Sequence, residues 1–337
     1  MKKVSWISLL TVVGIFLLVT SPAGAAPVVL KFGTVTPPQG WDVVNIIKPF
    51  AERVEKDAGG TVKIDIFAGG TLGRNPGEYA QLVLDGVMDM ALIINAMQPG
   101  RFPDDQVVNI PFTAREPIET TVAFNRMFAK GMIRGYENFL PLGFMGIQQF
   151  TIHTTFPVKT PEDLKGVKIH ISGKMMQAFT EAVGGVPLGI PATKFAETIS
   201  RGVIKGAIVD WNAAKQFRFL ELTPYHCMLP YGTTVISILM NKDSFNSLPP
   251  EAKASFKKHM GEPFAREWAL KYTKNVNQLV EEAKNNPKHH VYTPSPEEME
   301  QWKGLMWPVV EKWKKEHPNG KMLYDTYLSE VEKFRKE

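Results

Sequence analysis

The chain has 337 residues, of which 44% are hydrophobic and 22% are charged. This composition is typical of a folded globular protein and excludes a disordered chain, and the length predicts two domains of roughly 100–200 residues each. The formal net charge of +5 falls to +3 without Lys2 and Lys3 of a predicted leader, which is too weak and too scattered to indicate a nucleic-acid-binding protein.

The N-terminal segment, residues 1–25, has the pattern of a signal peptide. It starts with two lysines, residues 4–20 are almost wholly apolar, and Ala-Gly-Ala at 23–25 supplies small residues for cleavage after Ala25. A retained membrane anchor is the alternative, but the apolar run is short for a span, which needs about 20 residues. We therefore expect an exported, periplasmic protein. Its single cysteine, Cys227, cannot form an internal disulfide, so the fold must depend on its core.

After the leader, residues 26–148 alternate between strand and helix patterns. Strands are expected at 28–35, 61–67 and 87–94, and helices at 41–56 and 78–84. This alternation predicts an α/β fold with a parallel sheet. We expect these residues to form a first lobe.

The same pattern returns in residues 149–235. A helix is expected to start at Thr160, strands are expected at 167–172, 186–190 and 202–211, and the helices between them should end at Gly184-Gly185 and begin at Pro191 and Thr193. These residues are expected to form a second lobe. Two lobes with similar wiring, joined by crossing strands, are an architecture that buries a small ligand in the cleft.

The remainder of the chain predicts one strand and then helices. The strand is expected at 233–241, one long helix from Pro249-Pro250 to about Asn286, and a helical tail in which Trp302, Trp307 and Trp313 form a packing stripe. We expect residues 236–275 to complete the first lobe and 276–337 to complete the second.

Several motifs, in this order, resemble the solute receptors of tripartite ATP-independent periplasmic (TRAP) transporters. They are Leu-Lys-Phe-Gly at 30–33, Ala-Gly-Gly-Thr-Leu-Gly at 68–73, Leu-Asp-Gly-Val-Met-Asp-Met-Ala at 84–91 and Asp-Leu-Lys-Gly-Val-Lys-Ile at 163–169. The resemblance implies a type II periplasmic binding protein (Venus flytrap) fold with a long helix spanning both lobes. It also implies a monomeric receptor without a cofactor, which closes around a small molecule and delivers it to a pair of integral membrane subunits.

Ligands of open α/β folds bind beyond the carboxyl ends of strands, so the residues that follow each strand are candidates for the site. Residues 34–41 follow the first strand, and the other candidates follow later strands or flank the glycine-rich turn. The predicted ligand-binding residues are Trp41, Arg74, Asn95, Gln148, Phe150, His170, Asp210, Trp211 and Asn212.

His170 departs from the family pattern. It falls where the TRAP receptors have an arginine that clamps the ligand carboxylate. Three other positions also differ from the family. Phe150 falls where several members have a second arginine, Val209 or Asp210 falls where some have an asparagine, and Lys194 falls where a glutamate is common. Guanidinium matches both carboxylate oxygens, whereas imidazole offers one donor per nitrogen and is only partly protonated near pH 7. Another cation could compensate, and the candidates are Arg74, Lys174, Lys205 and Arg218.

The expected ligand is therefore a small organic acid with an aromatic or hydrophobic body. A neutral compound is the alternative, since it would explain the missing arginine directly, and a receptor that serves a sensor kinase would have the same cleft. The sequence lacks the nucleophile elbow, phosphate loop and His-Glu-x-x-His zinc motif, which argues against an enzyme. Cys227 is expected to be structural, and His289-His290 alone do not make a metal site.

Overall fold

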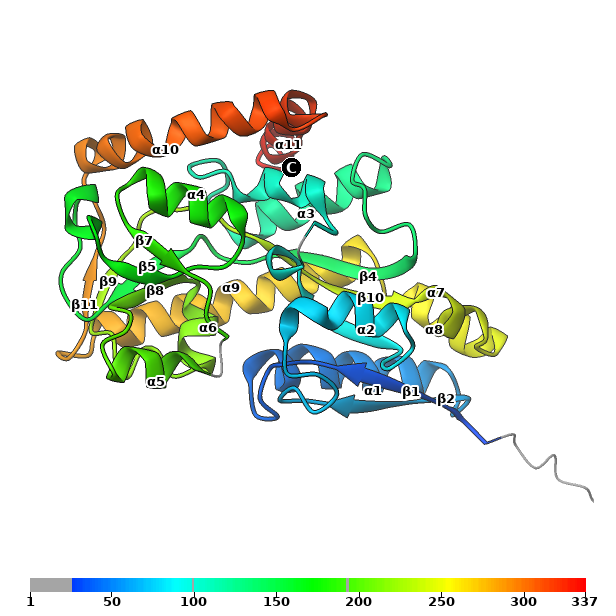
Figure 1. The fold of residues 1–337 in the computed structure, drawn as a ribbon. Helices are drawn as coiled ribbons and strands as arrows, with labels where there is room; N and C mark the ends of the chain where they lie inside the picture. Colours follow the sequence, from blue (N-terminus) through cyan, green and yellow to red (C-terminus); the bar gives the residue numbers. More distant parts are fainter. Residues whose placement is uncertain (1–25, 99, 192–193) are drawn as a thin grey trace, which may run out of the picture.

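A computed structural model of the chain describes residues 26–98, 100–191 and 194–337. The predicted leader and Thr193 lie outside the described residues. The fold has two lobes, each built on one mixed sheet with helices around it (Figure 1). The predicted two-lobed α/β fold is therefore confirmed.

The first lobe contains the sheet β2-β1-β3-β10-β4. Its strands are β1 (Val28–Gly33), β2 (Val62–Phe67), β3 (Met90–Ile94), β4 (Phe139–Gly146) and β10 (Val235–Asn241). β1 pairs in parallel with β2 and β3, whereas β10 lies antiparallel between β3 and β4. The late strand β10 thus joins the middle of a sheet made by the first part of the chain.

Short helices connect these strands. The predicted helix after β1 begins as a π-helical turn, η1 (Val43–Ile47), and continues as α1 (Lys48–Asp57). The 3₁₀ helix η2 (Pro76–Glu78) leads into α2 (Tyr79–Leu84), and η3 (Asn95–Met97) and η4 (Pro103–Asn109) follow β3. α3 (Pro117–Ala129) packs against β4.

The second lobe contains the sheet β11-β9-β5-β8-β6-β7. Its strands are β5 (Thr151–Thr154), β6 (Lys168–His170), β7 (Val186–Leu188), β8 (Gly206–Val209), β9 (Tyr225–Cys227) and β11 (His290–Tyr292). Its helices are α4 (Lys174–Ala182), α5 (Phe195–Ser200) and α6 (Trp211–Gln216). The predicted helix at Thr160 is only a 3₁₀ turn, η5 (Pro161–Leu164), closed by a capping box between Thr160 and Asp163.

The long helix predicted from Pro250 to about Asn286 is broken. α8 (Pro250–Lys258) ends before Gly261, and α9 (Glu262–Lys284) starts after it. Gly261 has φ 84°, and its N–H donates to the Leu142 carbonyl at 2.7 Å, so a tertiary contact ends the first helix there. α9 then packs on α3 and β4 of the first lobe and on α6 and β11 of the second, so it contacts both lobes as predicted.

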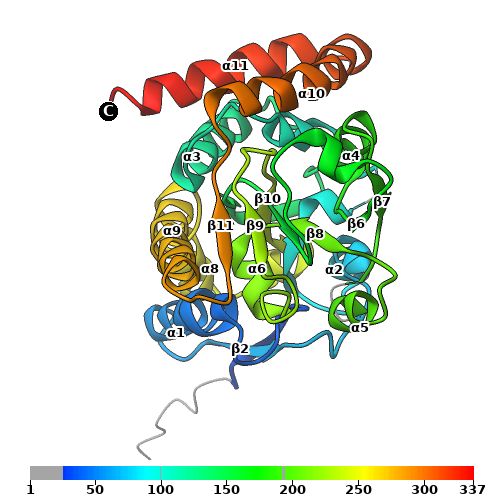
Figure 2. The same ribbon diagram turned by 90° about the vertical axis from the view of Figure 1, so that its left-hand side faces the viewer.

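The tail forms α10 (Pro296–Glu316) and α11 (Gly320–Phe334), which lie side by side at the top of both views (Figures 1 and 2). α10 packs on α4 of the second lobe, whereas α11 packs on α3 and η4 of the first. Trp302 and Trp313 are buried in this layer, as their spacing predicts. The tail therefore contacts both lobes.

Candidate functional site

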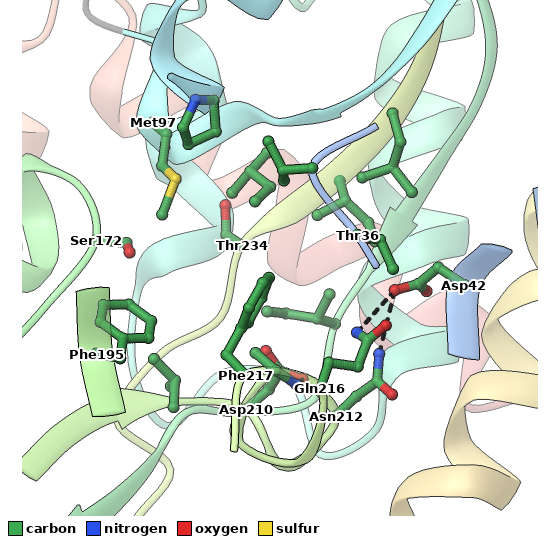
Figure 3. A pocket seen from close by; sticks show the side chains of 18 of the residues that line it. Thr36, Asp42, Met97, Ser172, Phe195, Asp210, Asn212, Gln216, Phe217 and Thr234 are labelled. Carbon is green, nitrogen blue, oxygen red and sulfur yellow. Dashed lines mark hydrogen bonds between the residues drawn. The ribbon is translucent and has the colours of Figure 1, made fainter. Parts of the chain in front are cut away.

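A cavity lies between the two lobes (Figure 3). It is lined by residues that follow β1, β3 and β4 in the first lobe and β6 and β8 in the second, which is where open α/β sheets place their ligands. Its volume is about 100 Å³ on a scale where one water needs roughly 10–15 Å³, so it has room for a small organic molecule. We call it the interlobe cavity.

Most of the cavity wall is apolar. The apolar lining residues include Val35, Leu92, Ile94, Met97, Ile147, Phe150, Phe195, Val209, Phe217 and Ile236. Phe195 begins α5 and Phe217 directly follows α6, and their rings meet edge to face with centroids 6.3 Å apart. Such a surface suits a ligand with a ring or a branched hydrocarbon body.

One end of the cavity is polar, and it joins the lobes. Asp42, at the start of η1, accepts hydrogen bonds through Oδ2 from Gln216 Nε2 at 3.0 Å and from Asn212 Nδ2 at 3.3 Å, both on α6 of the second lobe (Figure 3). Asp42 is only 5% exposed. Burial raises the pKa of its carboxyl to about 6, and the nearby charge of Asp210 adds to the rise, whereas the two amide hydrogen bonds oppose it.

Asp210 lines the same end and holds the start of α6. Its Oδ1 accepts from the Ala213 N–H at 3.0 Å, as a helix N-cap does, and from the Tyr272 hydroxyl on α9 at 2.5 Å. Burial raises the pKa of this carboxyl above its usual value, although the bond from Tyr272 opposes the rise. The cap and the tyrosine together fix α6, and with it Asn212 and Gln216, relative to α9.

His170, at the end of β6, is buried and neutral. It is 1% exposed, and burial lowers the pKa of its imidazole to about 3. Its Nδ1 accepts from the Ile190 N–H at 3.2 Å, which leaves the proton on Nε2, 3.4 Å from Ser172 Oγ. Burial thus favours the neutral imidazole, which would offer a ligand one N–H, and the role of His170 in the site stays a prediction.

The structure brings together some of the predicted site residues. Those that line the interlobe cavity are Arg74, Phe150, His170, Asp210 and Asn212. Arg74 is exposed, so the lining cation is at the rim of the cavity. Among the other candidate cations, Arg218 is paired with Glu221 at 2.7 Å on the surface, and Lys174 and Lys205 are not among the lining residues.

The other predicted residues lie behind the wall. Trp41 packs edge to face on Tyr272 with ring centroids 5.9 Å apart, and Trp211 is fully buried against the rings of His153 and His226. Gln148 is partly buried and is not among the lining residues.

Asn95 is directed into the core of the first lobe. It donates to Asp105 and Tyr136 and accepts from the Ser237 hydroxyl. The ends of the strands thus predict which segments form the site. Which side chains of a segment face the cavity depends on the helix or turn that carries them.

Several lining residues were not among the predicted site residues, namely Asp42, Ser172, Phe195, Gln216, Phe217 and Tyr272, whereas Thr36 belongs to the predicted segment 34–41. A signal existed for two of them. Asp42 comes directly after the segment 34–41, and Gln216 lies four residues after Asn212 on the same helix, so both face the same way. Tyr272 had no such signal, because it reaches the site only through the packing of α9.

Outside the cavity, the second lobe contains a chain of histidines. His153 Nδ1 lies 2.7 Å from His226 Nδ1, and His226 Nε2 lies 2.9 Å from His289 Nδ1. No group of three or more His, Cys, Asp or Glu side chains within the described residues is arranged to hold a metal ion. Cys227 is buried and its pKa is raised to about 12 by burial, which keeps the thiol protonated and unreactive.

The comparisons with known proteins agree with this architecture. Residues 32–316 match the family described as bacterial extracellular solute-binding protein, family 7. The chain is 22% identical over 299 residues to the C4-dicarboxylate-binding periplasmic protein DctP of Rhodobacter capsulatus, covering 86% of this chain and 88% of that protein. Over residues 26–98, 100–191 and 194–337, no helix is long and apolar enough to cross a membrane.

Two solved structures are similar over nearly their whole length. One is a marine metagenome TRAP solute-binding protein specific for aromatic acid ligands, in complex with 3-hydroxybenzoate, with a TM-score of 0.87, 25% identity and coverage of 92% of this chain and 99% of that one. The other is a TRAP solute-binding protein from Rhodoferax ferrireducens with copurified benzoate, with a TM-score of 0.86, 24% identity and coverage of 92% and 99%. The extent of the family match, together with the two lobes around one cavity, shows that this chain belongs to the DctP family of TRAP transporter solute-binding proteins, which bind solutes and are not enzymes.

Proposed function

We propose that this protein is the extracytoplasmic receptor of a TRAP transporter, that it captures a small organic acid with an aromatic or hydrophobic body, and that it delivers the acid to integral membrane subunits. The observation that carries the proposal is the interlobe cavity, in which apolar walls from both lobes enclose a few polar groups. Similar structures that hold 3-hydroxybenzoate or benzoate support the aromatic body.

The mechanism is closure of the lobes around the ligand. The chain crosses between the sheets at 147–150 and at 228–234, and Ile147, Phe150 and Thr234 of these crossings line the cavity. A ligand that contacts both lobes favours the closed form by its difference in affinity for the two forms. Membrane subunits that recognise the closed form would make transport depend on the ligand.

A thermal-shift screen followed by calorimetry tests this proposal. The panel contains benzoate and phenylacetate, the C4 dicarboxylate succinate, and the neutral analogues benzamide and benzyl alcohol. At a hundredfold excess over Kd, binding stabilises the native state by about 2.7 kcal/mol, which corresponds to a shift in Tm of roughly 4 °C for a chain of this length. A rise in melting temperature with the aromatic carboxylates alone supports the proposal. Binding of succinate alone would overturn the claim that the ligand has an aromatic or hydrophobic body.

A neutral solute is the second candidate. It is favoured by the neutral state of His170 and by the buried carboxyls Asp42 and Asp210, while the lining cation Arg74 is exposed. A charged carboxylate placed next to the two carboxyls would be repelled. Stronger binding of benzyl alcohol or benzamide than of benzoate would support this candidate.

A further inference from the structure

We propose that the ligand carboxylate binds just outside the interlobe cavity, in the open space that leads into it, between Lys174 of the second lobe and Arg74 of the first. The aromatic or hydrophobic body fills the cavity itself, and a short chain of carbon atoms joins the two parts of the ligand. This inference rests on the proposed function, since it concerns the same site and names the form of the acid.

The open space, which we call the mouth, is continuous with the interlobe cavity. It has a volume of about 460 Å³ and lies between η2 and η3 of the first lobe and the start of α4 of the second. Asn75, Lys174 and Gln177 on its border are exposed, so the mouth opens to solvent. The residues that line both the cavity and the mouth are Pro76, Met97, His170, Ser172 and Pro191.

The size of the interlobe cavity limits what it can hold. An apolar cavity of about 150 Å³ holds one benzene molecule. The interlobe cavity has a volume of about 100 Å³, so one ring fills it. The other parts of a longer ligand then lie in the mouth.

The cavity and the mouth also differ in charge. Asp42 and Asp210 line the cavity, whereas Lys174 carries the only full charge among the described residues that line the mouth. Met97 and Ser172, which line both spaces, lie on the side of the cavity away from Asp42 (Figure 3). A carboxylate is repelled by the two carboxyls and attracted by the lysine, so the acid group of the ligand turns toward the mouth.

Ser172 supplies a donor where the two spaces meet. His170 Nδ1 accepts from the Ile190 N–H at 3.2 Å, so His170 carries its proton on Nε2, which lies 3.4 Å from Ser172 Oγ. The imidazole N–H therefore points to the serine oxygen, and the serine hydroxyl keeps its own proton for a ligand oxygen. In this arrangement His170 positions Ser172.

Cations from both lobes flank the mouth. Arg74 is exposed at the rim of the cavity and directly precedes Asn75, which lines the mouth on the side of the first lobe. The lobes lie close together here, because a Cβ added to Gly173, next to Lys174, would lie 3.1 Å from the Cβ of Ala96. A carboxylate that contacts both cations joins the two lobes and so favours closure.

The experiment varies the length of the chain between ring and carboxylate. Calorimetry on the purified protein measures Kd for benzoate, phenylacetate, 3-phenylpropanoate and 4-phenylbutanoate, and for the four corresponding primary amides. The ratio of amide Kd to acid Kd at each length removes the contribution of the added methylene groups, which acid and amide share. We expect this ratio to be smallest for benzoate and about fivefold larger or more for the acid whose carboxylate reaches the mouth.

Two variants locate the carboxylate. Lys174→Gln and Arg74→Gln should each lower the ratio for the best acid by about two- to fivefold, because exposed ion pairs are weak, and should leave the Kd of its amide unchanged. Lys168→Gln is the matched control. It removes the same charge from an exposed position at the start of β6, away from the cavity and the mouth, and should keep the wild-type ratio.

The outcomes separate this inference from the proposed function. A ratio that is equal at all four lengths, or largest for benzoate, would overturn the inference and leave the proposed function standing. An increase with length that neither variant reduces would also overturn it, because the carboxylate then lies elsewhere. A reduction in one variant alone supports the mouth and names the cation that holds the carboxylate. Absence of binding by every acid would overturn the proposed function, and this inference with it.

Discussion

Gln216 Nε2 donates a hydrogen bond to Asp42 Oδ2 at 3.0 Å, and the two residues belong to different lobes. Gln216 closes α6 of the second lobe, and Asp42 begins η1 of the first. The backbone at Gly40 lies close to the Gln216 side chain. A Cβ added to Gly40 would lie 2.6 Å from Gln216 Oε1, so a larger residue at position 40 would displace this amide. The hydrogen bond is a direct link between the two lobes.

Gln216→Ala removes this link. Because a hydrogen bond to a charged group contributes about 1.5–3 kcal/mol, we expect the variant to bind its ligand roughly tenfold or more weakly. X-ray scattering should also show a more open average shape at a given ligand concentration. Gln278→Ala on the exposed face of α9, where the glutamine donates to Glu282 on the same helix, is the matched control and should behave like the wild type. Unchanged affinity in Gln216→Ala would show that the link does not hold the lobes together.

His170→Ala tests the neutral imidazole. With the pKa of His170 lowered to about 3, its charge does not change between pH 6 and pH 8, so the ratio of variant to wild-type Kd should be the same at both values. Loss of a donor to the ligand predicts a ratio of about ten. Any titration of Asp42, whose pKa is about 6, affects both proteins and cancels in the ratio. A larger ratio at pH 6 than at pH 8 would instead show that a protonated imidazole binds the ligand carboxylate.

His170→Gln keeps an N–H donor, so this variant should recover part of the affinity that His170→Ala loses.

Asp105→Asn should change how stability depends on pH. Burial raises the pKa of Asp105 to about 7, well above its value in the unfolded chain. The native state therefore keeps the proton over a pH range in which the unfolded chain has lost it. As pH rises from about 4 to 7, this carboxyl destabilises the native state increasingly. The variant should therefore gain about 2–3 kcal/mol relative to the wild type between pH 5 and pH 8, measured by urea unfolding.

The baseline stability of Asp105→Asn is not the test, because the new amide also meets Asn95 and Tyr136. Asp65→Asn on the surface should show no such pH-dependent gain. An equal difference from the wild type at pH 5 and pH 8 would contradict the buried, protonated carboxyl.

His153→Phe should reduce acid sensitivity. Burial lowers the pKa of His153 well below 6.5, so the unfolded chain binds a proton that the native state does not, and stability is lost as pH falls through the ordinary histidine range. Between pH 7 and pH 5 this costs about 2 kcal/mol for one buried histidine. Between pH 7 and pH 5, the free energy of unfolding should therefore fall by about 2 kcal/mol less in the variant than in the wild type, whatever the stability of the variant at pH 7.

Denaturant unfolding at the two pH values measures the difference. His290→Gln, at an exposed imidazole, is the control and should keep the wild-type pH dependence. If His153→Phe keeps it as well, the buried histidine chain is not the cause of acid sensitivity.

The sequence predicted the local elements well where a short-range rule applies. Glycine pairs and alternating apolar residues marked β1, β2, β3 and the central strands of the second lobe, because strand periodicity and helix ends depend on neighbours in the chain. The prediction of one helix from Pro250 to about Asn286 was wrong, because Gly261 ends α8 through a contact with Leu142, more than a hundred residues away.

For the site, the sequence by itself determined which segments follow the strands. That His170 stands where the family has an arginine stays a prediction from the resemblance. Only the tertiary structure decided that Asn212 faces the cavity while its neighbour Trp211 is buried, and that Asp42 meets Gln216, 174 positions along the chain. The physical reason is that strand and helix patterns arise from interactions between near neighbours. The state of charge of Asp42 and His170, by contrast, depends on burial and on partners that only the packing of the two lobes brings together.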